Sequence, residues 1–172
     1  MLTPRIRTAA CALALATTLL VSACSTDEGG SEAPAPNTPA ATATEDEVVT
    51  VLEAFWAERV RVESSGRYDT ADFSGILSPR MIEPQTQQYR QFDETGFRRV
   101  GQPQLRDYTA EVDGDTAIAT VCVQEDAWGA EADVEIAEPE PQGWYASSHR
   151  LERADDAWLI VDTATPPAGV SC

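Results

Sequence analysis

Cys24 is the residue whose surroundings predict the most specific chemistry in this chain. It follows two small residues at the end of an apolar stretch, residues 9–21, which Arg5 and Arg7 precede. A basic start, an apolar centre and small residues before a cleavage point form a secretory signal peptide, and a cysteine directly after the cut accepts lipid. The stretch is shorter than the about 20 apolar residues that span a membrane. The sequence therefore predicts that signal peptide 1–23 is removed and that lipid on Cys24 anchors the chain to the cell membrane, facing the extracytoplasmic side.

Cys122 and Cys172 predict a second kind of thiol chemistry. Because Cys11 lies within the signal segment, these two form the remaining pair of the processed chain beside Cys24. Disulfides persist in exported proteins, and a bond between Cys122 and Cys172 closes a loop of about 50 residues, which stabilises a fold by roughly 4 kcal/mol. The alternative is a pair of buried free thiols.

The sequence holds little that could carry catalysis or bind a metal. His149 is the single histidine, so a two-histidine zinc site cannot form, and the two later cysteines lack the close spacing of structural zinc ligands. A Gly-x-Ser-x-Gly nucleophile motif and a phosphate-binding glycine loop are both absent. The acidic stretches 113–115 and 155–156 lack the calcium-loop pattern and predict hairpin turns. We therefore expect no catalytic residue, no metal and no cofactor.

The charge of the chain limits its partners. The net charge is −17 and the sequence contains no lysine. Phosphate backbones are bound mainly through Lys and Arg, so nucleic acid is excluded as a partner. Anionic lipid would repel the same charge, which leaves the lipid on Cys24 as the expected source of membrane affinity.

The first structural element expected after the signal is a tether, followed by a helix. Residues 24–44 are rich in Ala, Pro, Thr and Ser and predict a disordered linker. Thr44 and Glu47 have the spacing of a capping box, which predicts a helix that ends near Ser64. Arg59 falls within the apolar face of this helix, whose other members are Val48, Leu52, Phe55, Trp56 and Val60.

Two further helical segments are expected before the strands. Phe73, Ile76 and Leu77 predict a short helical turn over residues 71–77. Ser78-Pro79 is a sound place for a second helix to begin, but proline costs about 3 kcal/mol in a helix interior and is tolerated in the first turn. The main helical segment is therefore expected to start near Pro84 and to end before Gly96, with Tyr89 and Phe92 as its anchors.

After Gly96 the pattern changes to alternating apolar and polar residues, which predicts four or five antiparallel strands. Two hairpins are expected, with turns at residues 113–114 and 155–156. The clearest alternation covers residues 130–136 and ends at a proline-rich break. The strand after the first turn should place its apolar face opposite Cys122, and that face consists of Ala117, Ala119, Val121 and Val123.

Three segments of the strand region support a family resemblance: Gly101-Gln102-Pro103, the cysteine-containing stretch 117–124, and Asp156-Ala157-Trp158. With helices first and a long antiparallel meander after them, residues 45–172 resemble the NTF2-like lipoproteins of high-GC Gram-positive bacteria. The resemblance implies an α+β fold of the NTF2-like, or cystatin-like, cone type. In such a fold N-terminal helices pack on a curved antiparallel sheet of four to six strands.

The resemblance also implies a pocket between the first helix and the sheet. Period-two spacing places Tyr145 and His149 on one strand face, and Trp56 and Arg59 point inward from the helix. For His149 the alternative is a partly exposed strand histidine. For Arg59 the alternative is an ion pair or an aliphatic stem that reaches along apolar surface.

From these features we expect a non-enzymatic, lipid-anchored envelope protein whose NTF2-like domain binds a protein partner or a small apolar ligand. One alternative is a small isomerase or dehydratase with His149 as its base and Tyr145 or Arg59 as electrophile. A second alternative is an accessory subunit of an envelope complex.

Overall fold

The computed structural model describes residues 40–136 and 140–172. The expected signal peptide, Cys24 and residues 24–39 of the expected tether lie outside the described residues. Two helices and two antiparallel sheets make up the described part, so the fold class is α+β, as the sequence predicted.

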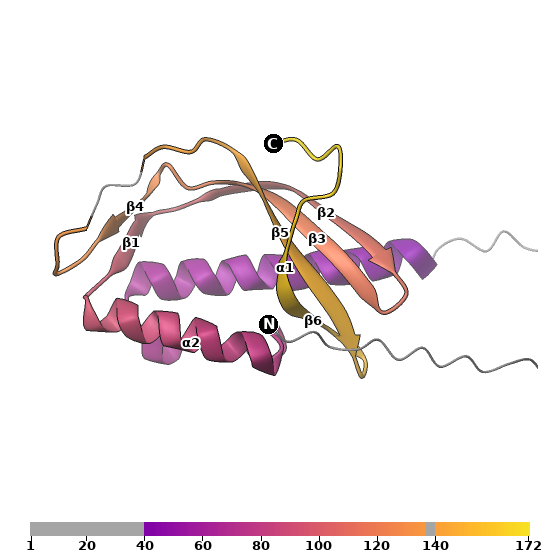
Figure 1. Ribbon diagram of the computed structural model, residues 1–172, viewed down its shortest axis with the longest axis horizontal. Helices are drawn as coiled ribbons and strands as arrows, with labels where there is room; N and C mark the ends of the chain where they lie inside the picture. Colours follow the sequence, from indigo (N-terminus) through magenta and orange to yellow (C-terminus); the bar gives the residue numbers. More distant parts are fainter. Residues whose placement is uncertain (1–39, 137–139) are drawn as a thin grey trace, which may run out of the picture. The chain divides into compact units, whose positions relative to one another are not determined.

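Helix α1, Ala40–Ser65, packs against both sheets (Figure 1). It begins five residues earlier than expected, so Thr44 lies inside the helix instead of capping it. The reason is local, because residues 40–44 contain three alanines, the best helix former, and no breaker. The predicted apolar face is confirmed: Val48, Leu52, Phe55 and Trp56 are buried, and Val60 is partly buried.

Helix α2, Pro79–Glu94, also begins earlier than the sequence predicted. Its first residue is Pro79, and Pro84 lies inside it on the exposed side. Ser78 starts the helix because its carbonyl accepts hydrogen bonds from the backbone N–H groups of Met81 and Ile82. The predicted end before Gly96 and the anchoring role of Tyr89 are confirmed. A short 3-10 helix, η1, covers Tyr68–Thr70 within the connection between α1 and α2.

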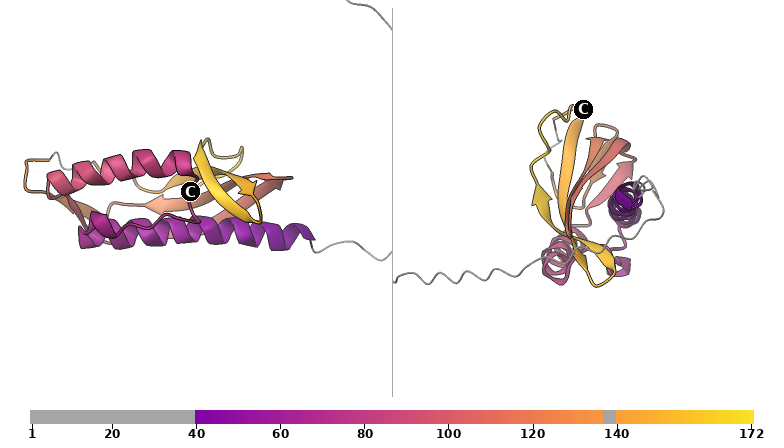
Figure 2. Two further views of the ribbon diagram at one scale, coloured as in Figure 1. Left: turned by 90° about the horizontal axis from the view of Figure 1, so that it is seen from below. Right: turned by 90° about the vertical axis from the view of Figure 1, so that its right-hand side faces the viewer.

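The larger sheet has the strand order β2-β3-β5-β6. Strands β2 (Gln104–Asp113) and β3 (Thr116–Gln124) form the first expected hairpin, and β5 (Tyr145–Ala154) and β6 (Ala157–Ala164) form the second. Residues of β3 alternate as predicted, with Ala117, Ala119, Val121 and Val123 in the core. Figure 2 shows α1 running along the strands of this sheet.

The smaller sheet pairs β1 (Arg98–Gly101) with β4 (Trp128–Glu131). The strand expected over residues 130–136 therefore ends at Glu131. The partner strand β1 begins only at Arg98, opposite Glu131, because the chain leaves α2 through a turn at Gly96. Beyond Glu131, the backbone N–H of Asp133 donates to the Thr95 carbonyl instead of continuing the strand pairing. Val134 and Ile136 are consequently exposed, at 51% and 37%.

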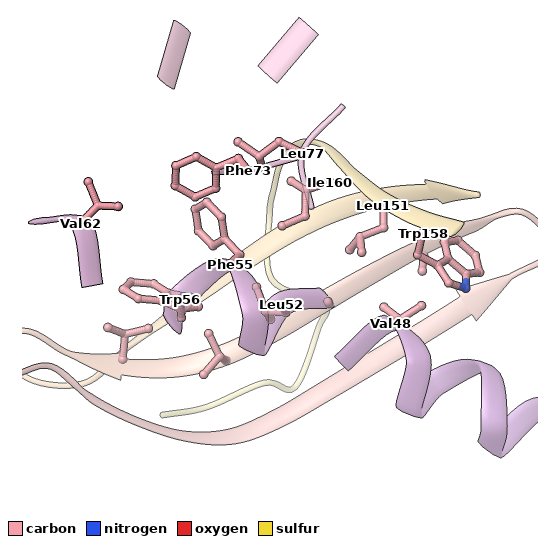
Figure 3. Close-up of a cluster of buried hydrophobic side chains, with 14 of the residues drawn as sticks. Val48, Leu52, Phe55, Trp56, Val62, Phe73, Leu77, Leu151, Trp158 and Ile160 are labelled. Atoms are coloured by element: carbon pink, nitrogen blue, oxygen red, sulfur yellow. The ribbon is translucent and has the colours of Figure 1, made fainter. Parts of the chain in front are cut away.

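The core lies between α1, the connection after η1 and the larger sheet. Figure 3 shows side chains of α1 meeting those of β5 and β6, with Phe73 and Leu77 closing one side. On the opposite face of β3, Cys122 is buried, and its sulfur lies 2.05 Å from that of Cys172. The chain after β6 thus returns to the sheet at the predicted disulfide position.

Candidate functional site

The four residues expected to line a pocket are not gathered around one opening. Trp56 and His149 are 1% and 7% exposed and belong to the packed interior. Arg59 and Tyr145 are partly buried, and Tyr145 lines a small cleft of about 170 Å³ together with Glu125, Trp128 and Arg99. The charge of Arg59 acts on both His149 and Tyr145, but only Tyr145 lines this small cleft.

His149 faces α1 from the middle of β5. Its ring centroid lies 5.0 Å from that of Phe55, and its Nε2 lies 3.4 Å from Ser147 Oγ. Burial, with a smaller contribution from the positive charge of Arg59, lowers the pKa of His149 to about 4. The imidazole is therefore neutral at pH 7 and is packed against an aromatic ring of the core.

Arg59 forms an ion pair, which is one of the alternatives that the sequence left open. Its Nε lies 2.9 Å from Glu63 Oε1, and its Nη2 lies 3.4 Å from Glu125 Oε1. The guanidinium also lies over the ring of Trp56, at 4.7 Å, and over that of Trp128, at 5.2 Å. The indole rings and two carboxylates thus account for the presence of a cation in the apolar face of α1.

Glu63 is the buried centre of this ion cluster, and the sequence analysis missed it. Its side chain is 3% exposed, and Arg99 Nε lies 3.7 Å from Oε2, the oxygen that Arg59 Nε does not contact. Tyr89 donates its hydroxyl hydrogen to Oε1 at 3.5 Å. Burial raises the pKa of Tyr89, so the hydroxyl remains a donor. The spacing of Arg59 and Glu63, four residues apart on a helix, was the available sequence signal.

A larger opening in the described residues lies elsewhere, between the η1 connection and α2. This cleft, which we call the η1–α2 cleft, has a volume of about 470 Å³. That volume lies in the usual range for small-molecule sites, about 300 to 1,000 Å³. Its lining consists of Tyr68, Asp69, Ala71, Asp72, Phe73, Ser74, Ile82, Gln85, Thr86, Tyr89, Arg90 and Asp93.

Some residues of this lining were predicted from the sequence, but as core residues rather than as residues of a cleft. Phe73 and Tyr89 were expected to anchor the interior, and both are buried. The carboxylates of Asp69, Asp72 and Asp93 were not singled out, because two of them lie in a non-periodic connection. Their approach to α2 depends on tertiary packing.

Two other features are absent from the described residues. No group of three or more His, Cys, Asp or Glu side chains in residues 40–136 and 140–172 could hold a metal ion. Within the same ranges, no helix has the length and apolar character needed to cross a membrane.

Comparisons with known proteins identify no family for this chain. No protein-family model matches the chain, and no curated protein matches its sequence. Among solved structures, the intermembrane space region of chloroplast protein ARC6 is similar to this chain with a TM-score of 0.48 and 14% identity. The match covers 75% of this chain and 97% of that one.

Proposed function

We propose that this chain is a lipid-anchored extracytoplasmic binding protein with an NTF2-like domain and no catalytic activity. Lipid on Cys24 holds the chain at the membrane, residues after it act as a tether, and the domain binds a small, largely apolar ligand in the η1–α2 cleft. The observation that carries this proposal is the cleft itself, which offers about 470 Å³ above a floor of aromatic rings.

The chemistry of the cysteines supports the compartment. The signal-like residues before Cys24 predict export, and the pair Cys122 and Cys172 lies at disulfide distance. Such bonds are rare in reducing compartments and common outside the cytoplasm. Two separate features of the chain therefore favour the same location.

The side chains of the cleft favour binding over catalysis. General acid–base catalysis works best with a group whose pKa lies near the operating pH. Hydrogen bonds from the side chain and backbone of Ser74 instead lower the pKa of Asp72, which makes it a weaker base. His149, the base of the enzymatic alternative, is not among the residues that line the η1–α2 cleft.

Native mass spectrometry of the full chain, extracted in non-ionic detergent, tests the proposed cleft. We expect wild-type chain to retain a co-purifying small molecule and the cleft-filling variant Thr86→Trp to lose it. Thr86 lines the cleft on the exposed side of α2, so the larger side chain should not disturb the core.

Gln87→Trp is the matched control, because Gln87 is the next residue, is also exposed and does not line the cleft. It should retain the ligand. Equal retention by Thr86→Trp and wild type would contradict the cleft as the binding site. Capture of a neighbouring membrane protein by crosslinking, with no ligand retained, would favour the accessory-subunit alternative.

The anchor has its own test. Cys24→Ala should abolish incorporation of labelled palmitate, because the acceptor thiol is gone. Lipid labelling that persists in this variant would contradict anchoring through Cys24.

A further inference from the structure

The floor of the η1–α2 cleft consists of aromatic rings whose polar groups are engaged elsewhere. Ring centroids of Tyr68 and Tyr89 lie 5.1 Å apart, and those of Phe73 and Tyr89 lie 5.9 Å apart. The Tyr68 hydroxyl donates to the Phe97 carbonyl at 2.6 Å, and that of Tyr89 is directed to Glu63. The cleft therefore meets ring carbons rather than phenol hydroxyls. Aromatic faces carry partial negative charge and attract cations.

The rim of the cleft is acidic. Asp69 and Asp72 stand on the η1 side and Asp93 on the α2 side, and all three are exposed. Arg90 is the single cation among the residues that line the cleft. The nearby Arg61 also acts electrostatically on Asp72, but its guanidinium pairs with Glu58 at 2.7 Å and so brings a further carboxylate with it.

Asp72 is held in place as a charged group. Its Oδ1 accepts hydrogen bonds from the Ser74 backbone N–H at 3.0 Å and from Ser74 Oγ at 2.6 Å. Its own N–H donates to Glu58 Oε1 at 2.7 Å. A carboxylate held in this way loses little further conformational freedom when a ligand binds beside it.

We infer that the η1–α2 cleft selects an organic cation, a small molecule that carries an ammonium group on an apolar body. The inference rests on the proposed function and adds the charge of the ligand to it. The apolar body would lie on Tyr68, Phe73 and Tyr89, and the ammonium group would face the carboxylates of the rim. The net charge of the chain, −17, favours the approach of the same class and disfavours anions.

Isothermal titration of the full chain in non-ionic detergent tests the charge with three probes that share one ring: benzyltrimethylammonium, benzyl alcohol and phenylacetate. We expect the cation to bind about tenfold more tightly than the alcohol, and phenylacetate to bind more weakly than both. Raising the salt concentration should weaken the binding of the cation but not that of the alcohol, because salt screens the exposed rim charges.

Single substitutions locate the effect. Asp72→Asn should lower the affinity for benzyltrimethylammonium about two- to fivefold, as expected for an exposed carboxylate, and should leave the affinity for benzyl alcohol unchanged. Asp93→Asn is a second variant, which removes a rim charge without touching the Ser74 hydrogen bonds. Asp156→Asn, in the β5–β6 turn, removes the same charge away from the cleft lining and should change neither affinity.

The outcomes separate the inference from the proposed function. Equal binding of cation and alcohol, or a neutral or anionic ligand released by Thr86→Trp, would overturn the inference and leave the binding cleft standing. Binding of the cation that Asp72→Asn and Asp93→Asn leave unchanged would also overturn it. Failure of all three probes to bind, with no ligand retained by the wild-type chain, would overturn both.

Discussion

Breaking the bond between Cys122 and Cys172 should destabilise the domain by an amount that depends on the C-terminal tail. The two cysteines are 50 residues apart, and in the chain-entropy model such a crosslink restricts the unfolded chain by about 4 kcal/mol. That full value is lost on reduction only if the folded state is unchanged.

The structure indicates that the folded state also changes. Strand β6 ends at Ala164, and Cys172 is held further by a hydrogen bond from Arg106 Nη2 to its carbonyl, at 3.0 Å. If the tail detaches on reduction, the folded chain regains the freedom of a loop of about eight residues. The logarithmic dependence on loop length then leaves a net loss of about 2 kcal/mol. We expect the measured loss to lie between about 2 and 4 kcal/mol.

Urea unfolding, followed by tryptophan fluorescence and circular dichroism with and without reductant, measures this loss. Cys172→Ser should match the reduced wild type, and Ser171→Ala, the neighbouring control, should unfold like the oxidised wild type. Removal of residues 165–172 should give the same stability as Cys172→Ser if the tail detaches. A loss below about 1 kcal/mol would refute the reasoning.

Three other substitutions test the packing around the site. His149 has a lowered folded pKa, so its stabilisation is complete above pH 6.5 and is lost as pH falls toward 4. By urea titration, the free energy of unfolding of the wild type should fall by about 1 kcal/mol between pH 7.5 and 5.5. His149→Gln should remove this part of the pH dependence. The same pH dependence in wild type and variant would contradict the assignment to His149. Glu63→Gln should cost about 3 kcal/mol, because Arg59 loses its buried partner, whereas the exposed Glu53→Gln should cost less than about 0.5 kcal/mol. Gly101→Ala should cost about 2 kcal/mol by thermal unfolding, because its φ is +89° and a Cβ would overlap the Ala127 carbonyl; wild-type stability would contradict this.

Local patterns predicted the parts of the fold that local interactions determine. The apolar face of α1 and both hairpins follow from periodicity and turn residues within one segment. The position of Cys122 opposite the core face of β3 follows from period-two alternation alone. These features required no knowledge of distant parts of the chain.

The structure differs from the sequence predictions where contacts between distant segments determine where an element begins or ends. Residues 130–136 alternate well, but the partner strand β1 is short, so Val134 and Ile136 have no strand to pair with. Pro84 was expected to start α2, yet the start depends on Ser78, which donates its backbone N–H to the Ile160 carbonyl of β6. Segment patterns contain no information on either contact.

The candidate site was only partly predictable for the same reason. The pocket residues Trp56 and His149 were assigned to one inward side, and the structure fills that space with core side chains. The η1–α2 cleft depends on how residues 68–74 fold back beside α2. Its aromatic floor was visible as apolar residues, whereas its acidic rim has no periodic signal.

The measurement that tests the central claim most directly is the titration of the full chain with benzyltrimethylammonium, in wild type and in Thr86→Trp. The account predicts binding to wild type and loss of that binding when the η1–α2 cleft is filled, with Gln87→Trp unchanged. Binding that survives in Thr86→Trp, or no binding to the folded wild-type chain, would contradict it.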